Sequence, residues 1–466
     1  MKPIQIDKET EYDLKMRGIK VLNVLMMAGS FAVMWKKFYL ASFLMILHVE
    51  GRTGAGWFPS LLYMLFYCMN GRIYEAFLVS YNRVGEMIYS QMLSAMLSSL
   101  YIYLGCTVLS GRALLVLPFI LLLAVQMVLS CTWCWAANKW YYRRYAPRRT
   151  AIIWDMRKDL EDLLHQHNLE KKFSVASILH ITACLEDLTQ LRGMDTVFLT
   201  GIHSSDRNRI IKYSVEEDIT AFIIPRIGDT LMSGAKRINL LHLPLLRLKR
   251  YSPPPEYQIL KRAGDIVLSL AALLLLSPLM LATAICIYAE DRGPVFYRQS
   301  RLTKDGKVFQ ILKFRSMRVD AEKDGIARLS SGTSDTRVTR IGRRIRSVRI
   351  DELPQLLNVL KGDMSLVGPR PERPEIAEIY TKKLPEFALR LQCKAGITGL
   401  AQVYGKYSTE PYDKLQMDLM YIENPKITED LRILLVTLKI LFLPESTEGI
   451  REGTRIAGEE QPKTHS

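Results

Sequence analysis

Two adjacent acids, Asp351 and Glu352, follow a very basic stretch of the chain. Residues 291–350 contain 16 Lys and Arg but only 6 Asp and Glu, which gives this stretch a net charge of +10. Such a concentration of positive charge favours an anionic partner, either phosphates or an anionic membrane surface. An apolar run that ends at Gly362 follows the acids. This order predicts that Asp351 lies at the start of a short helix.

A helix start among cations suits an acid that acts on phosphorus. The helix dipole favours the ionised carboxylate. An ionised Asp can attack phosphorus, and a neighbouring Glu can hold a divalent metal that neutralises the attacked phosphate. Phosphoryl transfer needs little beyond positioning and charge neutralisation. Most Asp-Glu pairs are solvated helix starts, so it is the surrounding cations that favour a catalytic interpretation of Asp351 and Glu352.

Several cations are candidates for holding phosphate groups beside these acids. Lys313 and Arg315 lie two residues apart, so a strand over residues 313–317 would place both on one face, with a solvated edge strand as the alternative. Residues 364–371 predict a strand that runs into a rigid turn. This turn presents the guanidinium of Arg370, which suits bidentate contact with phosphate. The remaining candidates are Arg346, five residues before Asp351, and Arg301 in the same basic stretch.

Length and composition bound the elements that must position these residues. The 466 residues are enough for two or three domains. A hydrophobic content of 49% is high for a soluble enzyme that is also 24% charged, so apolar and charged residues must occupy different parts of the chain. The net charge of +16 fits an anionic surface or nucleic acid. The sequence has no zinc-finger-like, helix-turn-helix-like or RRM-like pattern, so we expect no nucleic-acid partner.

Apolar runs in the first 149 residues predict a transmembrane helical bundle, with spans at about 19–35, 55–69, 88–110 and 113–136. The last two can cross a hydrocarbon core of about 30 Å, whereas the first two are marginal and a further run, 38–48, leaves their limits open. Five cations and no acid follow between residues 138 and 150, which predicts a cytoplasmic location from there on. The runs contain almost no polar residues, which argues against a channel or transporter.

Residues 150–250 predict a Rossmann-like α/β domain, because short strands and helices alternate. The turn after the first strand, residues 155–158, lacks the glycines that let a backbone approach a pyrophosphate. We therefore expect a structural or regulatory domain without a bound cofactor. Three consecutive prolines predict a linker over 251–260. The strands are expected at 151–154, 173–180, 195–199 and 221–224, and the helices at 158–167 and 207–215.

An uncharged run over residues 266–288 is long enough for one more transmembrane helix. Two features favour a re-entrant hairpin instead. Pro278, preceded by Ser277, would break the helix in the middle of the run. Basic residues flank both ends, so both ends favour the cytoplasmic face. A helix that is broken at this pair, enters one leaflet and returns satisfies both observations.

The remaining features have ordinary interpretations. Cys131 and Cys134 resemble half of a redox or zinc site, but their apolar surroundings favour buried, unpaired thiols. Residues 394–402 form a glycine-spaced loop that could approach a ligand closely. Residues 431–443 are too short to span a membrane and predict an interfacial or core helix. Residues 446–466 predict a disordered tail.

The segment from Lys261 to about Leu443 resembles the bacterial sugar transferases, the polyprenyl-phosphate glycosylphosphotransferases that are also described as monotopic phosphoglycosyl transferases. The preceding apolar runs and α/β domain resemble the family's large members, which initiate capsular or exopolysaccharide synthesis. Ala395 stands where the family usually has Pro, which loosens the glycine loop. The resemblance rests on several long motifs in the family's order, at residues 313–317, 351–356, 361–371 and 396–399.

The resemblance implies a two-step reaction. Asp351 would attack the β-phosphate of a UDP-sugar, release UMP and carry the sugar phosphate, which undecaprenyl phosphate would then accept. Glu352 matches the acid that holds Mg²⁺, and Ser277-Pro278 matches the break of the re-entrant anchor. Family positions expected to hold phosphates correspond to Lys313, Arg315, Arg346 and Arg370.

These expectations define a membrane protein of the cytoplasmic (inner) membrane with a cytoplasmic catalytic domain. Its partners would be the UDP-sugar, undecaprenyl phosphate and the lipid bilayer, and a homo-oligomer is compatible with the sequence. The transferred sugar stays open. A non-catalytic nucleotide-sugar-binding scaffold is the alternative, although it would not need the acid pair. The expected parts are a transmembrane region (1–149), the α/β domain (150–250), the linker (251–260), the catalytic domain (261–445) and the tail (446–466).

Overall fold

The computed structural model describes residues 8–40, 57–111, 114–240, 242–319, 337–405 and 410–440. The chain divides into two compact units, Met1–Ile224 (unit 1) and Pro225–Ser466 (unit 2). The expected division into five parts stays a prediction. The predicted tail, 446–466, and most of the apolar run 38–48 lie outside the described residues.

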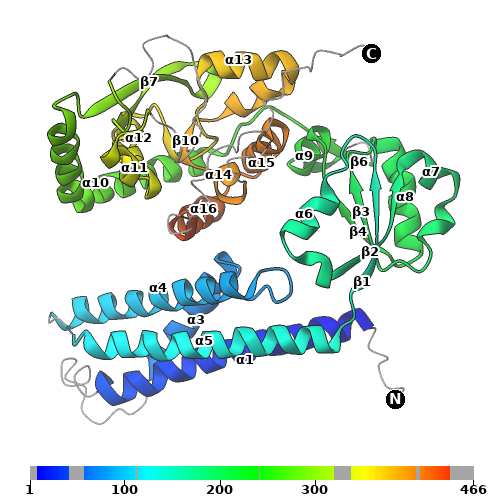
Figure 1. The fold of residues 1–466 in the computed structure, drawn as a ribbon, viewed down its shortest axis with the longest axis horizontal. Helices are drawn as coiled ribbons and strands as arrows, with labels where there is room; N and C mark the ends of the chain where they lie inside the picture. Colours follow the sequence, from blue (N-terminus) through cyan, green and yellow to red (C-terminus); the bar gives the residue numbers. More distant parts are fainter. Residues whose placement is uncertain are drawn as a thin grey trace. The chain divides into compact units, whose positions relative to one another are not determined.

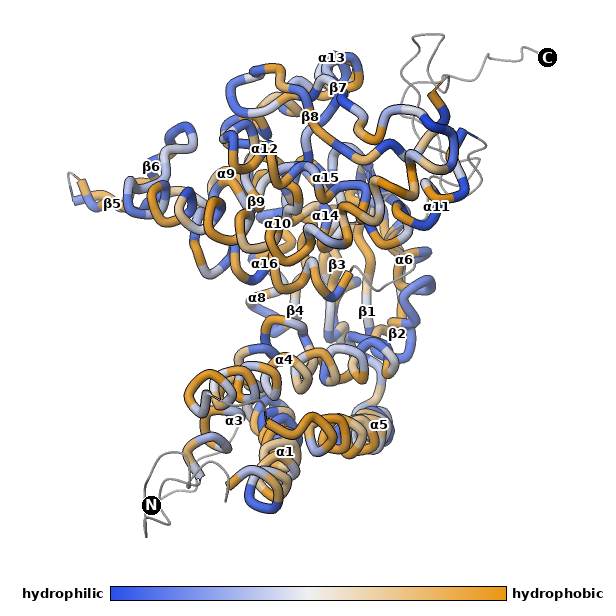
Figure 2. Tube along the Cα trace, turned by 90° about the vertical axis from the view of Figure 1, so that its left-hand side faces the viewer, coloured by the Kyte–Doolittle hydropathy of each residue, from blue (hydrophilic) through white to orange (hydrophobic). Residues whose placement is uncertain are grey.

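The described part of unit 1 begins with a bundle of helices (Figure 1), namely α1 (Lys8–Phe38), α3 (Phe58–Ile73), α4 (Val84–Ser110) and α5 (Leu117–Arg144). Three of them are long and apolar enough to cross a membrane, at Tyr12–Phe38, Val84–Ser110 and Leu117–Arg144. Figure 2 shows hydrophobic residues following one another along α5. The predicted span 55–69 falls on α3, which has 16 described residues. At about 1.5 Å per residue, such a helix is shorter than a hydrocarbon core of about 30 Å.

Polar side chains lie inside this bundle. Asn23 donates to Gln91 at 3.3 Å and accepts from Tyr67 at 2.9 Å, and Asn70 donates to Ser98 at 2.9 Å. The expectation that these runs contain almost no polar residues is therefore wrong. Buried hydrogen bonds between helices favour one particular packing, because another packing would leave these groups without partners. Further buried polar residues of the bundle are Ser90, Ser94, Ser99, Gln126 and Ser130.

A four-stranded parallel sheet follows the bundle, with the order β2-β1-β3-β4. It confirms the predicted α/β arrangement and parallel pairing. The sheet is covered on both faces (Figure 1). Ile153 and Leu199 pack with Ile210 of α8 on one face, whereas Ile152 packs with Leu164 of α6 on the other. The elements are β1 (Arg148–Trp154), α6 (Leu160–Gln166), η2 (Leu169–Lys171), β2 (Phe173–His180), α7 (Ile181–Glu186), η3 (Leu188–Leu191), β3 (Thr196–Thr200), α8 (Ser204–Glu216) and β4 (Thr220–Ile223).

The core of unit 2 forms where short helices and short strand pairs meet. Val359 of α12, Met364 before β9, and Leu415 of α15 are fully buried there. The elements are α9 (Ile227–Ser233), β5 (Lys236–Leu240), β6 (Leu243–Arg247), α10 (Pro255–Asp291), β7 (Phe296–Leu302), η4 (Lys304–Gly306), β8 (Val308–Phe314), α11 (Arg340–Ser347), η6 (Ile350–Glu352), α12 (Gln355–Lys361), β9 (Ser365–Val367), α13 (Pro374–Lys383), η7 (Pro385–Gln392), β10 (Gly396–Thr398), α14 (Leu400–Tyr404), α15 (Pro411–Glu423) and α16 (Ile427–Ile440).

The glycines of the predicted loop serve the packing of strands. β9 and β10 pair in parallel, and their neighbouring backbones approach so closely that a Cβ on Gly396 would lie 2.1 Å from the Gly368 nitrogen. A side chain at either position would force the backbones apart. The glycine loop was expected to approach a ligand closely, but here the segment that it approaches is the backbone around Gly368.

Both ends of α10 are fixed to unit 2 by polar contacts. Near the start of the helix, Arg262 donates to the carbonyls of Val359 and Leu360 at 2.7 and 2.8 Å, at the end of α12. At the other end, Glu290 accepts the backbone amide of Arg340 at 2.9 Å, at the start of α11. The middle is different, since Leu275 is 80% exposed. The described cysteines are all free, and Cys286 in this helix is exposed. Cys134 is buried as expected, whereas Cys131 is only partly buried.

Ser277 and Pro278 lie inside α10, where Figure 1 shows the helix bending. Proline has no N–H, so the carbonyl of Leu274 loses its normal helix partner. The Ser277 hydroxyl donates to this carbonyl at 2.8 Å. The pair therefore interrupts the helix without leaving a carbonyl unsatisfied in apolar surroundings. α10 is also long and apolar enough to cross a membrane.

Candidate active site

The acid pair lies in η6, the single turn between α11 and α12. Asp351 is 8% exposed, and Arg349 before the turn has φ of 55°. The expected helix start is displaced, because α12 begins at Gln355. Thus the acids occupy a turn that packs against β8 and α11, in place of the first turn of the helix.

Asn358 fixes α12, and with it the acid pair, against β8. Its side-chain oxygen accepts the backbone amide of Leu312 at 2.9 Å, and its amide nitrogen donates to the carbonyl of Gln310 at 2.8 Å. One side chain thus forms hydrogen bonds with two backbone groups on the edge of β8. The next residue along, Lys313, is thereby brought to the acids.

Glu352 binds two of the predicted cations. Lys313 Nζ and Arg370 Nη2 each lie 3.0 Å from Glu352 Oε1. Burial alone would raise the pKa of Glu352, but Lys313, Arg370 and Arg349 outweigh it and hold the pKa well below its ordinary value. Glu352 is therefore a carboxylate at neutral pH, and both hydrogen bonds are charge-assisted.

Asp351 has the opposite shift. Burial and the neighbouring charge of Glu352 raise its pKa, while Lys313, Arg346 and Arg370 oppose the rise. The adjacent acids therefore differ in their tendency to ionise because their surroundings differ. A raised pKa close to the acid end of the neutral range is a common property of groups that react.

Arg349 is a functional candidate that our sequence analysis missed. It lies two residues before Asp351, and its pKa is lowered by burial and by Arg370, with Glu352 and Asp351 opposing. Its left-handed backbone turns the chain between α11 and the acids. The basic stretch contains it, but no periodicity distinguishes it from its neighbours.

The structure brings the predicted cations to different places. Arg346 is close enough to lower the pKa of Asp351. Arg315 pairs with Asp291, the last residue of α10, and is 7% exposed. It therefore connects β8 with the end of α10. Because Asp291 precedes it by 24 residues, sequence spacing gave no signal for the pair.

Arg301 lies at the turn that carries Arg370. It donates to the carbonyl of Pro371 at 3.1 Å and is 4.0 Å from Glu372. Burial lowers its pKa to about 10, opposed by Glu372, so the guanidinium remains charged at neutral pH. Arg301 thus fixes the turn from the side of β7.

Arg390 fixes the same turn from the other side. It donates to the carbonyl of Arg370 at 3.0 Å and pairs with Asp418 at 2.7 Å and with Glu372 at 3.4 Å. We call Arg390, Asp418 and Glu372 the Arg390 cluster. No local pattern of the sequence indicates these residues, which are brought together from η7, α15 and the turn.

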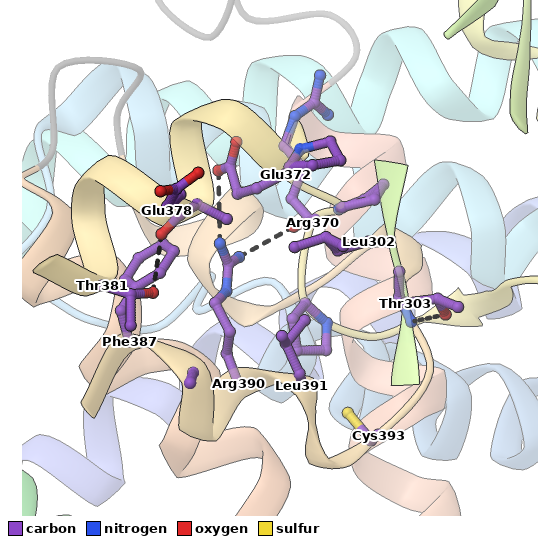
Figure 3. A pocket seen from close by; sticks show the side chains of 16 residues that line it. Leu302, Thr303, Arg370, Glu372, Glu378, Thr381, Phe387, Arg390, Leu391 and Cys393 are labelled. Carbon is purple, nitrogen blue, oxygen red and sulfur yellow. Dashed lines mark hydrogen bonds and ion pairs between the residues drawn. The ribbon is translucent and has the colours of Figure 1, made fainter. Parts of the chain in front are cut away.

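A cavity of about 330 Å³ lies beside this turn, between α13 and η7. We call this cavity the turn pocket. Figure 3 shows Arg390 reaching from η7 toward Glu372 and the Arg370 carbonyl. Apart from these charged groups, much of its lining is apolar, including Leu302, Pro371, Phe387 and Leu391.

The expected magnesium ion would have two carboxylates available at this site, those of Asp351 and Glu352. Among the described residues no group of three or more His, Cys, Asp or Glu is close enough to form a complete metal site. Mg²⁺ usually binds one or two carboxylates together with substrate phosphates and waters. Lys313 and Arg370 both contact Oε1 of Glu352, so the donor set of Glu352 and Asp351 suits an ion that arrives with phosphates.

Comparisons with known proteins identify the family to which unit 2 is similar. Residues 256–444 match a family model described as bacterial sugar transferase. The chain is 41% identical over 209 residues to the UDP-glucose:undecaprenyl-phosphate glucose-1-phosphate transferase of Caulobacter vibrioides, covering 43% of this chain and 78% of that relative. It is 40% identical over 227 residues to the UDP-N-acetylgalactosamine-undecaprenyl-phosphate N-acetylgalactosaminephosphotransferase of Aeromonas hydrophila, covering 48% and 52%.

A third relative shows the same pattern. The UDP-glucose:undecaprenyl-phosphate glucose-1-phosphate transferase of Escherichia coli is 38% identical over 234 residues, covering 46% of this chain and 50% of that relative. The chain thus matches about half the length of the Aeromonas and Escherichia proteins. The three names specify two different sugars, glucose and N-acetylgalactosamine.

Proposed function

Because the chain belongs to the bacterial sugar transferase family, we propose that it transfers a sugar 1-phosphate from a UDP-sugar to undecaprenyl phosphate. The products are UMP and an undecaprenyl-diphosphate sugar, the first membrane-bound intermediate of an exopolysaccharide or capsule. The observation that carries this proposal is the pair of buried acids, Asp351 and Glu352, held among Lys313, Arg346 and Arg370. The relatives' names supply the classes of donor and acceptor.

In the first step the ionised carboxylate of Asp351 attacks the β-phosphorus of the donor. A bond forms between the carboxylate oxygen and phosphorus, and the bond from phosphorus to the bridging oxygen breaks, so that oxygen leaves with UMP. Lys313 and Arg370 stabilise the charge that develops on the phosphate oxygens. Their common contact with Glu352 Oε1 holds both cations in place before the substrate arrives.

In the second step a phosphate oxygen of undecaprenyl phosphate attacks the same phosphorus. The bond to Asp351 breaks, which returns the carboxylate and leaves a diphosphate between lipid and sugar. Glu352, with the substrate phosphates, would hold Mg²⁺, which neutralises phosphate charge when bound. The raised pKa of Asp351 suits the first step, because a carboxylate that is easier to protonate is the better nucleophile.

We further propose that α10 enters one leaflet of the cytoplasmic membrane and returns, with unit 2 in the cytoplasm. Its two ends bind the same unit through Arg262 and Glu290, and its exposed apolar middle is interrupted at Ser277 and Pro278. A hairpin in one leaflet lets a lipid phosphate and a soluble nucleotide meet at the interface. The parallel sheet of unit 1 is proposed to be a Rossmann-like domain without a bound cofactor.

A donor panel tests the function. The full chain in lipid nanodiscs is supplied with Mg²⁺, undecaprenyl phosphate and one UDP-sugar at a time, and UMP release and the lipid product are measured. One or a few sugars should give both products. Without acceptor, sugar-labelled donor should leave about one label per chain. UMP release without a labelled protein would contradict the covalent step, and no release from any sugar would favour the scaffold alternative.

A further inference from the structure

The turn pocket is close to the acid pair because the two share Arg370. The guanidinium of Arg370 contacts Glu352 at 3.0 Å, while Arg370 also lines the pocket and its carbonyl accepts from Arg390. Arg370 thus connects the pocket with the acid pair. A ligand that places a phosphate beside Glu352 can extend its next group into the pocket.

The lining favours a flat, largely apolar group. Leu302, Pro371, Phe387 and Leu391 contribute apolar surface. Arg390 uses its guanidinium for Glu372, Asp418 and the Arg370 carbonyl. A sugar ring would bury several hydroxyls against a lining that is largely apolar, which is unfavourable. A pyrimidine base has two apolar faces and polar groups only at its edge.

The position of the pocket separates it from the lipid. α10 packs on α11, α12, β9 and α16, whereas the pocket lies between α13 and η7. Figures 1 and 2 both place α13 away from α16 within unit 2. The apolar surface that would enter a membrane belongs to α10, including Leu275 at 80% exposure. A lipid tail therefore has its contact surface elsewhere, and the pocket serves the soluble substrate.

We propose that the turn pocket binds the uracil base of the donor, with the diphosphate passing Arg370 toward the acid pair. This inference rests on the proposed function and names which part of the donor lies where. The leaving UMP then remains on the Arg370 side, while Asp351 attacks the β-phosphorus from the opposite side. The volume of about 330 Å³ lies at the small end of the usual range for ligand pockets, about 300–1,000 Å³.

Filling the pocket tests the proposal. Ala388 lines it and is exposed, so Ala388→Trp should occupy the space without disturbing the core. Glu386, two residues away, is exposed and does not line the pocket, and Glu386→Trp is the matched control. Binding of UDP and of inorganic pyrophosphate to the full chain with Mg²⁺ is measured by calorimetry. Ala388→Trp should weaken UDP binding at least tenfold, Ala388→Leu should weaken it less, and pyrophosphate binding should change less than twofold.

The other outcomes separate the two proposals. Unchanged UDP binding in Ala388→Trp overturns the pocket assignment, as does an equal loss for UDP and pyrophosphate. Unchanged UDP binding with a raised KM for undecaprenyl phosphate, or with an altered choice of sugar, would assign the pocket to lipid or sugar and also overturns it. If UDP binding falls as expected but wild-type protein releases no UMP from any donor, the pocket assignment stands and the proposed reaction fails.

Discussion

Two clusters of acids lie in unit 2, each with one buried Asp, and they differ in how their charges are balanced. In the Arg390 cluster, Asp418 is 1% exposed and pairs with Arg390, which also serves Glu372 and a backbone carbonyl. At the acid pair, Lys313 and Arg370 both contact one oxygen of Glu352. Arg346 and Arg349 add positive charge close by.

The difference indicates two purposes. The Arg390 cluster closes on itself, so its charges hold η7, α15 and the turn together. Four cations and two acids gather at the acid pair, which leaves positive charge for incoming phosphates. Burial raises the pKa of both Asp351 and Asp418, so a raised pKa alone does not identify the reactive acid. The balance of charge around it does.

Removing the nucleophile should have the largest effect. Asp351→Asn keeps the shape of the side chain but cannot form the bond to phosphorus, so kcat should fall by about 10³-fold or more. Because burial makes the ionised carboxylate of Asp351 costly, the variant should unfold at the same or a higher temperature at pH 8. UMP release and thermal unfolding are measured together. Substantial remaining turnover would remove Asp351 from its assigned role.

Breaking the Arg390 cluster should lower the stability of the fold. Arg390→Met leaves Asp418 and Glu372 without their shared guanidinium, and loss of one partner of a buried pair costs about 3–5 kcal/mol. Chemical denaturation of the full chain measures this loss. The control is Lys382→Met, which removes an exposed i,i+4 pair with Glu378 and should leave the free energy of unfolding nearly unchanged. Equal stability of the two variants would show that the cluster does not hold the fold.

Lys313→Met should lower the activity of the site but leave the protein folded. Loss of a preorganised cation at the reacting phosphate should lower kcat/KM about 10²-fold. Lys313 opposes the rise in the pKa of Asp351, so its removal should raise that pKa further. Since the ionised carboxylate is the nucleophile, activity falls as pH decreases through this pKa, and the midpoint should move to higher pH. Lys307→Met, at an exposed position before β8, is the control. An unmoved midpoint would contradict the assigned electrostatic role.

The sequence was sufficient to predict the acid pair and its main cations. Asp351, Glu352 and Arg370 could be identified because charge density and a rigid turn each have a local signature. Lys313 and Arg370 both lie beside Glu352. The strand predicted over residues 313–317 is wrong, because β8 ends at Phe314 and Arg315 lies beyond it. The partner of Arg315 could not be predicted, because its pairing with Asp291 depends on where the end of α10 meets β8.

The polar interior of the helical bundle could have been predicted. Ser90, Ser94 and Ser98 lie four residues apart, which places them on one face of a helix. Averaging hydropathy over the run hides this pattern, because the many apolar residues dominate. The Arg390 cluster gives no comparable signal, since its members come from separate elements and meet only after the core has formed.

Asp418→Asn should have the smallest effect and gives the sharpest test of the comparison. Burial raises the pKa of Asp418 from 3.8 to about 6. Its contribution to stability is therefore fully present below about pH 4 and is lost as pH rises through about 6. Asn does not titrate, so the stability of the variant should depend less on pH, and its unfolding temperature should fall less between pH 4 and 6. At pH 8 the variant no longer buries a charge, which stabilises it. It also lacks a counter-ion of Arg390, which destabilises it, so the two effects oppose each other. Turnover should change by less than about threefold; a loss like that of Asp351→Asn would mean that the two clusters are not separate in purpose.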